Sequence, residues 1–184
     1  MRRTNKQKRA VVLKISVCGV ISALSYCLLA IGSIVEIFDF SAVVIASVGV
    51  VFCVVEMGYS YAALTCAVTS LISFLLLPAS RFPALVYMLF GGIYPIIKSL
   101  AEKTKKPISI LLKFLFSNAS AALIWIITSW IMPETEHIGK LMLVTFVLLM
   151  NFAFWLYDVF ITRIVTMYLY KWRRQLNIKD FDKL

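Results

Sequence analysis

Six long apolar stretches, separated by short polar breaks, dominate the pattern along this chain. They cover residues 13–35, 40–56, 60–78, 83–99, 107–132 and 139–165. Each is close to the ~20 residues with which an α-helix crosses a hydrocarbon core about 30 Å thick. The breaks hold charged residues, glycines or prolines, which end helices. The pattern predicts an all-α integral membrane protein, a bundle of six transmembrane helices that forms one domain over residues 1–184.

The composition supports this prediction. Of the 184 residues, 61% are apolar and only 15% are charged. A water-soluble domain of this length exposes too much of its surface to hide so many apolar side chains. Residues 40–55 and 62–77 carry no ionised side chain at all. We therefore expect the lipid bilayer to be the main partner, in a multi-pass protein of the cell membrane.

The basic residues indicate an orientation. If the amino terminus lies in the cytoplasm and the helices alternate, 17 of the 19 Lys and Arg lie at cytoplasmic ends, leaving Arg81 and Lys140 outside. Cytoplasmic loops carry this excess of positive charge in membrane proteins. We therefore expect both termini in the cytoplasm, with residues 171–184 as an amphipathic tail on the inner lipid surface. The net charge of +10 is spread over short connections, which argues against a nucleic-acid partner.

The sequence lacks the parts of a typical enzyme. His137 is the only histidine, so a zinc site built on histidines is not available. No Gly-x-Ser-x-Gly elbow and no phosphate-binding loop occur. The four cysteines fall inside apolar stretches without a Cys-x-x-Cys pair, which favours a packing role. The sequence predicts no enzymatic activity, no metal and no cofactor.

Polar residues inside the last apolar stretch are the strongest candidates for chemistry. Asn151, Trp155 and Asp158 are spaced by four and three residues, so they share a helix face, which we expect to point into the bundle. An ionised side chain at this depth needs a partner. For Asp158 we expect Lys113 or Lys98. Such a pair can fix the helix register, or it can take part in gating or coupling.

Glycines and alanines mark places where helices can approach closely. Gly91-Gly92-Ile93-Tyr94-Pro95 weakens the fourth helix, which allows either a binding site or hinge, or close packing. Gly19 and Ala23 form a small-x-x-x-small pair in the first stretch, and Ala42, Ala46 and Gly49 do so in the second. Packing inside the bundle is the favoured use of both surfaces, with docking of a partner helix as the alternative.

Aromatic and polar residues toward the outer side suggest a ligand site. Trp125 and Trp155 are candidates to surround a flat or apolar ligand, together with Tyr87 and Trp130. The polar contacts would come from Arg81, Asn118, Asn151 and His137. The alternative is an aromatic belt at the membrane surface, which Trp130 fits best, whereas Trp155 lies too deep for a belt.

In plan the chain resembles the substrate-binding S components of energy-coupling factor vitamin transporters. The resemblance covers length, six helices, a basic amino terminus and both ends inside. In that family a small-residue motif in the first helix docks the transmembrane partner, which implies a docking role for Gly19 and Ala23. The family's pocket opens outward under the loop after the first helix, which implies ligand roles for Glu36, Asp39, Asn118, Asn151 and Trp155. The resemblance further implies ATPase partner subunits and a vitamin-like ligand.

Three functions follow as hypotheses. The first is a membrane-embedded subunit that binds a small organic nutrient for uptake and is energised by separate ATPase partners. The alternative is a scaffold or accessory protein of the cell envelope that transports nothing. A third is a self-sufficient, proton-coupled carrier that uses Asp158 and Glu56.

Overall fold

A computed structural model of the chain describes residues 2–131 and 140–172, which are almost entirely helical. The helices are α1 (Arg2–Ile34), η1 (Glu36–Phe38), α2 (Asp39–Glu56), α3 (Tyr59–Leu76), α4 (Phe82–Val86), η2 (Tyr87–Gly91), α5 (Tyr94–Ala101), α6 (Lys106–Ile131), α7 (Lys140–Met167) and η3 (Tyr168–Trp172). No strand occurs within these described ranges. Counting α4, η2 and α5 as one, six helices are long and apolar enough to cross a membrane. The prediction of an all-α protein with six such helices is confirmed.

The helix bounds differ from the sequence prediction mainly at the amino terminus. The first helix was expected to begin at residue 13, but α1 begins at Arg2. The polar residues before position 13 are largely Arg, Lys and Gln, which are good helix formers, so the helix continues through them beyond the apolar stretch. Of the expected tail, residues 173–184 lie outside the described ranges.

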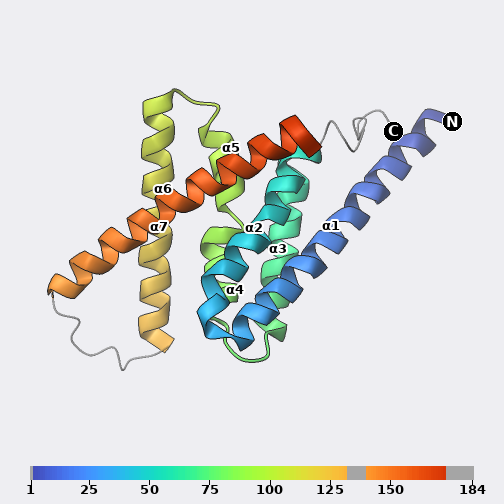
Figure 1. Cartoon of the computed structure of the whole chain (residues 1–184). Helices are drawn as coiled ribbons and strands as arrows, with labels where there is room; N and C mark the ends of the chain where they lie inside the picture. The colour runs from blue at the N-terminus through green and yellow to red at the C-terminus, as the bar shows by residue number, and fades with distance from the viewer. Residues whose placement is uncertain (1, 132–139, 173–184) are drawn as a thin grey trace.

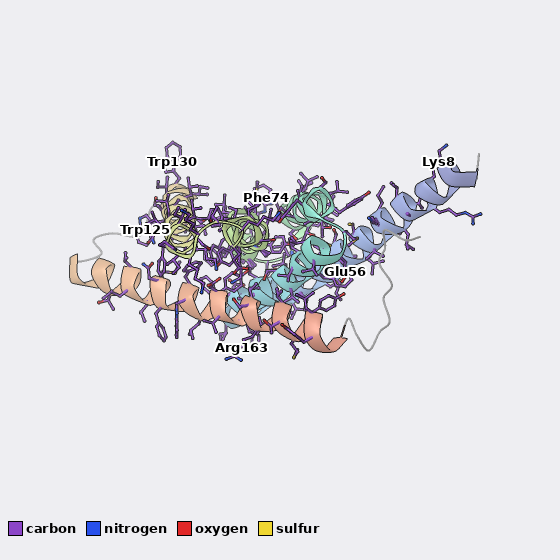
Figure 2. All side chains as sticks on the ribbon, turned by 90° about the horizontal axis from the view of Figure 1, so that it is seen from above. Lys8, Glu56, Phe74, Trp125, Trp130 and Arg163 are labelled. Carbon is purple, nitrogen blue, oxygen red and sulfur yellow. The ribbon has the colours of Figure 1, made fainter. Side chains whose placement is uncertain are left out.

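The helices are arranged as a bundle in which α1 and α7 are strongly tilted relative to α6 (Figure 1). Helix α2 contacts α1, α3, the α4–α5 segment and α7, while α6 contacts α5 and α7. Helix α7 crosses the other helices and lies along one side of them, as the view from above shows (Figure 2). Successive helices alternate in direction, so the start of α1, the α2–α3 turn, the α5–α6 loop and the end of α7 lie at one end. We call this the basic end, because Lys8, Arg9, Lys103, Lys105 and Lys106 lie there.

Small residues let α1 and α2 pack closely. A Cβ atom on Gly49 would lie 2.6 Å from the Cγ2 atom of Ile21, and one on Gly32 would lie 2.6 Å from the Cβ atom of Ala42. The hydroxyl of Ser25 donates a hydrogen bond of 3.4 Å to the carbonyl of Ala46. The small residues of the second apolar stretch therefore pack inside the bundle, as expected.

The small pair of the first stretch behaves differently, and the expectation of internal packing is wrong there. A Cβ atom on Gly19 would meet nothing within 4 Å, and Ala23 is exposed. The buried face of α1 runs instead through Cys18, Ser22 and Ser25. Because successive helix residues are about 100° apart, Gly19 and Ala23, each one position further on, point away from that face.

Gly91 and Gly92 of the fourth span allow it to pack closely against both α2 and α3. The backbone is π-helical over Tyr87–Gly91, and the Gly92 N–H donates to the carbonyl of Tyr87 across 2.7 Å. A Cβ atom on Gly91 would lie 2.5 Å from the Cγ1 atom of Val43 in α2, and one on Gly92 would lie 2.5 Å from the Sγ atom of Cys66 in α3. The helix break predicted from the sequence therefore exists, and it allows close contact on both sides.

The outer surface of the bundle is strongly apolar. Leu71, Leu75, Leu115 and Leu148 each expose about two thirds of their surface, and many other large apolar side chains are exposed as well. Soluble monomers rarely expose contiguous apolar patches of more than a few hundred Å². Together with the six apolar helices, this surface indicates contact with a lipid bilayer.

Candidate functional site

A cavity of about 510 Å³ lies between α2, the α4–η2 segment, α6 and α7. Pockets that hold small organic molecules usually measure about 300–1,000 Å³ and are mostly apolar. The lining residues are Phe40, Val43, Val44, Phe82, Val86, Phe90, Ser117, Ala121, Ile124, Trp125, Thr128, Leu149, Met150, Ala153, Phe154 and Tyr157. A second hollow, of about 690 Å³, lies between α1, α2 and α7, but it is more open and only two aromatic residues, Phe52 and Phe160, line it. The more enclosed and more aromatic cavity is therefore the better candidate for a binding site.

The cavity extends from the middle of the bundle toward the end opposite the basic end. Phe40 and Phe82 lie near the starts of α2 and α4, and their rings meet edge to face with centroids 5.7 Å apart. Thr128 lies near the end of α6, which points the same way (Figure 1). The deeper wall comes from Phe90 of η2 and Tyr157 of α7.

An aromatic layer lies beneath the cavity. It consists of the rings of Phe90, Tyr94, Phe116, Phe154 and Tyr157, with neighbouring centroids 5.2–6.4 Å apart. Tyr94 is fully buried within it. Offset-stacked and edge-to-face pairs at such distances are favourable and fix ring orientations. The layer is a rigid floor that joins η2, α5, α6 and α7.

Behind the aromatic layer, on its basic side, lies an ion cluster in which two buried lysines pair with the partly exposed Asp158 and Glu102. Lys98 is salt-bridged to the carboxylate of Asp158, and it donates hydrogen bonds to the Thr162 hydroxyl (2.7 Å) and the Asp158 carbonyl (3.0 Å). Lys113 lies 3.4 Å from Asp158 and 3.0 Å from Glu102. The side chains of Lys98 and Lys113 are only 5% and 12% exposed. The structure thus brings Asp158 together with both lysines that the sequence suggested.

The ion cluster balances its own charge. Two ammonium groups face two carboxylates, and each ammonium has oxygen partners. Buried charges are tolerated when they are paired and hydrogen-bonded. Because Lys98 belongs to α5, Lys113 to α6 and Asp158 to α7, the cluster fixes three helices relative to one another.

A second polar contact joins α6 and α7. The side-chain amides of Asn118 and Asn151 exchange two hydrogen bonds, of 3.2 and 3.3 Å. Each Nδ2 group also donates to a carbonyl four residues earlier in its own helix, Phe114 or Val147. Neither asparagine is part of the cavity lining. The two asparagines, which the sequence suggested as ligand contacts, are therefore hydrogen-bonded to each other.

Of the aromatic candidates, only Trp125 lines the cavity. Trp155 is 53% exposed and stacks on Phe152, so the expectation that its face points inward is wrong. The buried face of α7 is formed by Phe154, Tyr157 and Ile161. Asn151 and Asp158 lie about 40–60° from Phe154 around the helix, whereas Trp155 lies about 100° away.

None of the remaining candidates is among the described residues that line the cavity. The guanidinium of Arg81 lies over the ring of Phe74, 5.9 Å from its centroid, and Asp39 is buried at the start of α2. Glu36 begins η1, and its side chain is not among those described. Tyr87 is buried in the core and Trp130 is exposed near the end of α6 (Figure 2). His137 lies outside the described residues.

Several residues of the site were missed by the sequence interpretation. Tyr94 and Glu102 lie four residues before and after Lys98, and Thr162 lies four residues after Asp158. Helical spacing around Lys98 and Asp158, which the sequence did suggest, would therefore have identified these three residues. Phe154, Tyr157 and Ile161 also have helical spacing. No local signal pairs Phe90 with them, because that contact depends on how η2 meets α7.

Within the described ranges, no group of three or more His, Cys, Asp or Glu side chains lies close enough together to hold a metal ion. The chemistry that the arrangement offers is noncovalent binding of a molecule in an aromatic cavity. No protein-family model, no curated protein and no solved structure matches this chain.

Proposed function

We propose that this protein is the membrane-embedded, substrate-binding subunit of an uptake system for a small organic molecule. The observation that carries the proposal is the cavity of about 510 Å³ among α2, the α4–η2 segment, α6 and α7. A binding subunit needs a preformed hollow of ligand size, and this cavity supplies one among the second, fourth, fifth and sixth spans. A scaffold has no such need.

The orientation we propose places the basic end, and with it both termini, in the cytoplasm of a cell-membrane protein. Lys98, Lys103, Lys105, Lys106 and Lys113 belong to the α5–α6 connection and its flanks, and the start of α1 lies at the same end (Figure 1). The positive-inside rule assigns such an end to the cytoplasm. The cavity then opens toward the outside, where a nutrient arrives.

The proposed energy source lies in separate subunits, because the chain carries no nucleotide-binding motif. The resemblance to energy-coupling factor S components supplies the arrangement, in which a transmembrane partner connects the binding subunit to ATPases. The outward position of Gly19 and Ala23 on α1 supports this, since the space beside Gly19 leaves room for a partner helix.

A cavity-filling variant tests the binding role. Ala121 lines the cavity, whereas the neighbouring Ala122 is exposed on α6 and is not part of the lining. The protein is purified in mild detergent without nucleotide, and native mass spectrometry identifies small molecules that remain bound. We expect the same bound molecule in the unmodified protein and in Ala122→Trp, and none in Ala121→Trp. Equal retention by both variants, or no bound molecule in any of them, would contradict the proposal.

The second candidate function is a scaffold that binds another membrane protein and no ligand. The same outward pair, Gly19 and Ala23, favours it. Gly19→Leu separates the two functions, because it blocks a partner helix without touching the cavity. A scaffold loses its only activity in Gly19→Leu and is unaffected by Ala121→Trp. A binding subunit keeps its ligand in Gly19→Leu and loses only uptake.

A further inference from the structure

The lining of the cavity carries information about the ligand itself. We infer that the ligand is a flat molecule without negative charge, with an aromatic ring system and a hydrogen-bonding group toward each end. This inference rests on the proposed function and narrows the substrate class of the same cavity. It follows from the ring content, the absence of charge in the described lining and the position of two hydroxyl groups.

Aromatic side chains reach the cavity from every element that surrounds it. They come from α2, α4, η2, α6 and α7, and they are Phe40, Phe82, Phe90, Trp125, Phe154 and Tyr157. The rings of the floor are held by stacking and edge contacts with one another. Rigid ring faces and edges make favourable contacts with the faces and edges of another ring. A flat aromatic ligand therefore fits these walls better than a branched or globular one.

The described lining of the cavity contains no charged side chain. Among the described residues that line it, none is Asp, Glu, Lys, Arg or His. Lys98, Lys113 and Asp158 are behind Tyr94 and are already paired with one another or with Glu102. An anion that entered would give up its hydration without gaining a counter-ion, which is costly in an apolar site. The negative faces of the aromatic rings would repel it as well. Ligands with a carboxylate are therefore disfavoured.

Two hydroxyl groups remain for specific contacts. Ser117 and Thr128 both line the cavity from α6. They are three helical turns apart on one face, which separates them by about 16 Å along the helix axis. The Tyr157 hydroxyl, in contrast, already donates to the carbonyl of Gly91 across 3.5 Å. Hydrogen-bonding groups near both ends of the ligand match this spacing.

A lipid acyl chain is the competing occupant, because the bundle stands in a bilayer. An acyl chain cannot form hydrogen bonds with the two hydroxyls. It also loses conformational entropy when it binds, whereas a rigid ring system has little to lose. The aromatic ligand is therefore favoured, and the acyl chain becomes an outcome of the test.

The test uses 1-aminoanthracene, which is neutral at pH 7, and anthracene-1-carboxylate, an anion of nearly the same size. Equilibrium dialysis measures the binding of each probe to the protein purified in detergent. The Ala121→Trp variant gives the background from partition of the probe into detergent, and Ala122→Trp is the matched control. We expect saturable binding of 1-aminoanthracene to the unmodified protein and to Ala122→Trp, and at least tenfold weaker binding of the carboxylate.

The other outcomes overturn the inference in distinguishable ways. If the carboxylate binds as tightly as the amine, the exclusion of anions is wrong, although binding in the cavity, and with it the proposed function, stands. Dodecane is added as a competitor for bound 1-aminoanthracene. If dodecane and anthracene displace the probe at the same concentration, the cavity binds acyl chains as well as it binds ring systems. If neither probe binds above the Ala121→Trp background, the aromatic class is wrong, and the molecule found by native mass spectrometry decides separately on the proposed function.

Discussion

The phenol of Tyr94 donates a hydrogen bond of 2.5 Å to the carboxylate of Asp158. The ring of Tyr94 belongs to the aromatic layer beneath the cavity, and Asp158 is the central anion of the ion cluster. This one contact therefore connects an apolar site in the middle of the bundle to paired charges near its basic end. A change in the cluster is expected to disturb the floor of the cavity.

The first prediction concerns the balance of charge in the ion cluster. Lys98→Met leaves Asp158 and Glu102 facing Lys113 alone, and Asp158→Asn leaves two lysines facing Glu102 alone. Removing one partner of a fully buried ion pair costs about 3–5 kcal/mol. The loss here is smaller, because Asp158 and Glu102 are 24% and 49% exposed and a partner of opposite charge remains in each variant. We expect each variant to unfold at a clearly lower temperature than the unmodified protein, measured by circular dichroism in detergent.

The double variant Lys98→Met/Asp158→Asn is the control for this prediction. It leaves Lys113 and Glu102 as a neutral pair 3.0 Å apart, so we expect it to be more stable than either single variant. A double variant whose loss equals the sum of the two single losses would show that the charges act independently.

The second prediction concerns the glycine contact between η2 and α2. Gly91→Ala places a methyl group 2.5 Å from the Val43 Cγ1 atom, which is too close for either side to keep its position. Overpacking of this kind costs about 1–3 kcal/mol. We expect a lower unfolding temperature, partly restored by the second change Val43→Ala. Gly19→Ala is the matched control, because nothing lies within 4 Å of its Cβ position, and a similar loss there would contradict the packing explanation.

The third prediction concerns the two asparagines. Asn118→Leu leaves the amide of Asn151 without its partner in α6, and Asn151→Leu does the reverse. Hydrogen bonds between membrane helices are worth about 0.6 kcal/mol on average and at most about 1.7. In a double-mutant cycle followed by denaturation in mixed micelles, we expect a coupling free energy in this range. A coupling of zero would mean that the amide pair does not hold α6 against α7.

The fold was predictable where the physical signal lies within one segment. Six apolar stretches of suitable length predict six membrane helices, since the cost of burying unpaired backbone groups in lipid leaves few other structures. The glycine and proline residues at 91–95 likewise predict a weakened helix, and the backbone over Tyr87–Gly91 is π-helical.

The site was harder to predict, because its parts come from distant segments. The charge of Asp158 inside an apolar stretch demands a cation, which led to Lys98 and Lys113. No comparable demand places Phe90 against Tyr157, since an apolar ring is satisfied by lipid as well as by protein. For the same reason the direction of Trp155 was predicted wrongly: α7 crosses the bundle diagonally (Figure 1), and its buried face depends on that crossing. The direction of Gly19 likewise depends on which face of α1 packs against α2 and α3, and that face runs through Cys18, Ser22 and Ser25.

The last prediction tests the orientation on which the proposed function depends. Ala79 lies in the α3–α4 connection and Lys105 in the α5–α6 connection, and both are exposed. These connections belong to opposite ends of the bundle (Figure 1). If the basic end is cytoplasmic, a membrane-impermeant maleimide added to intact cells labels Ala79→Cys, and it labels Lys105→Cys only after the cells are permeabilised. The unmodified protein measures the background, because Cys18, Cys53 and Cys66 are buried and Cys27 lies within the apolar part of α1. Labelling of Lys105→Cys in intact cells would place the cavity on the cytoplasmic side, where it could not receive a nutrient from outside.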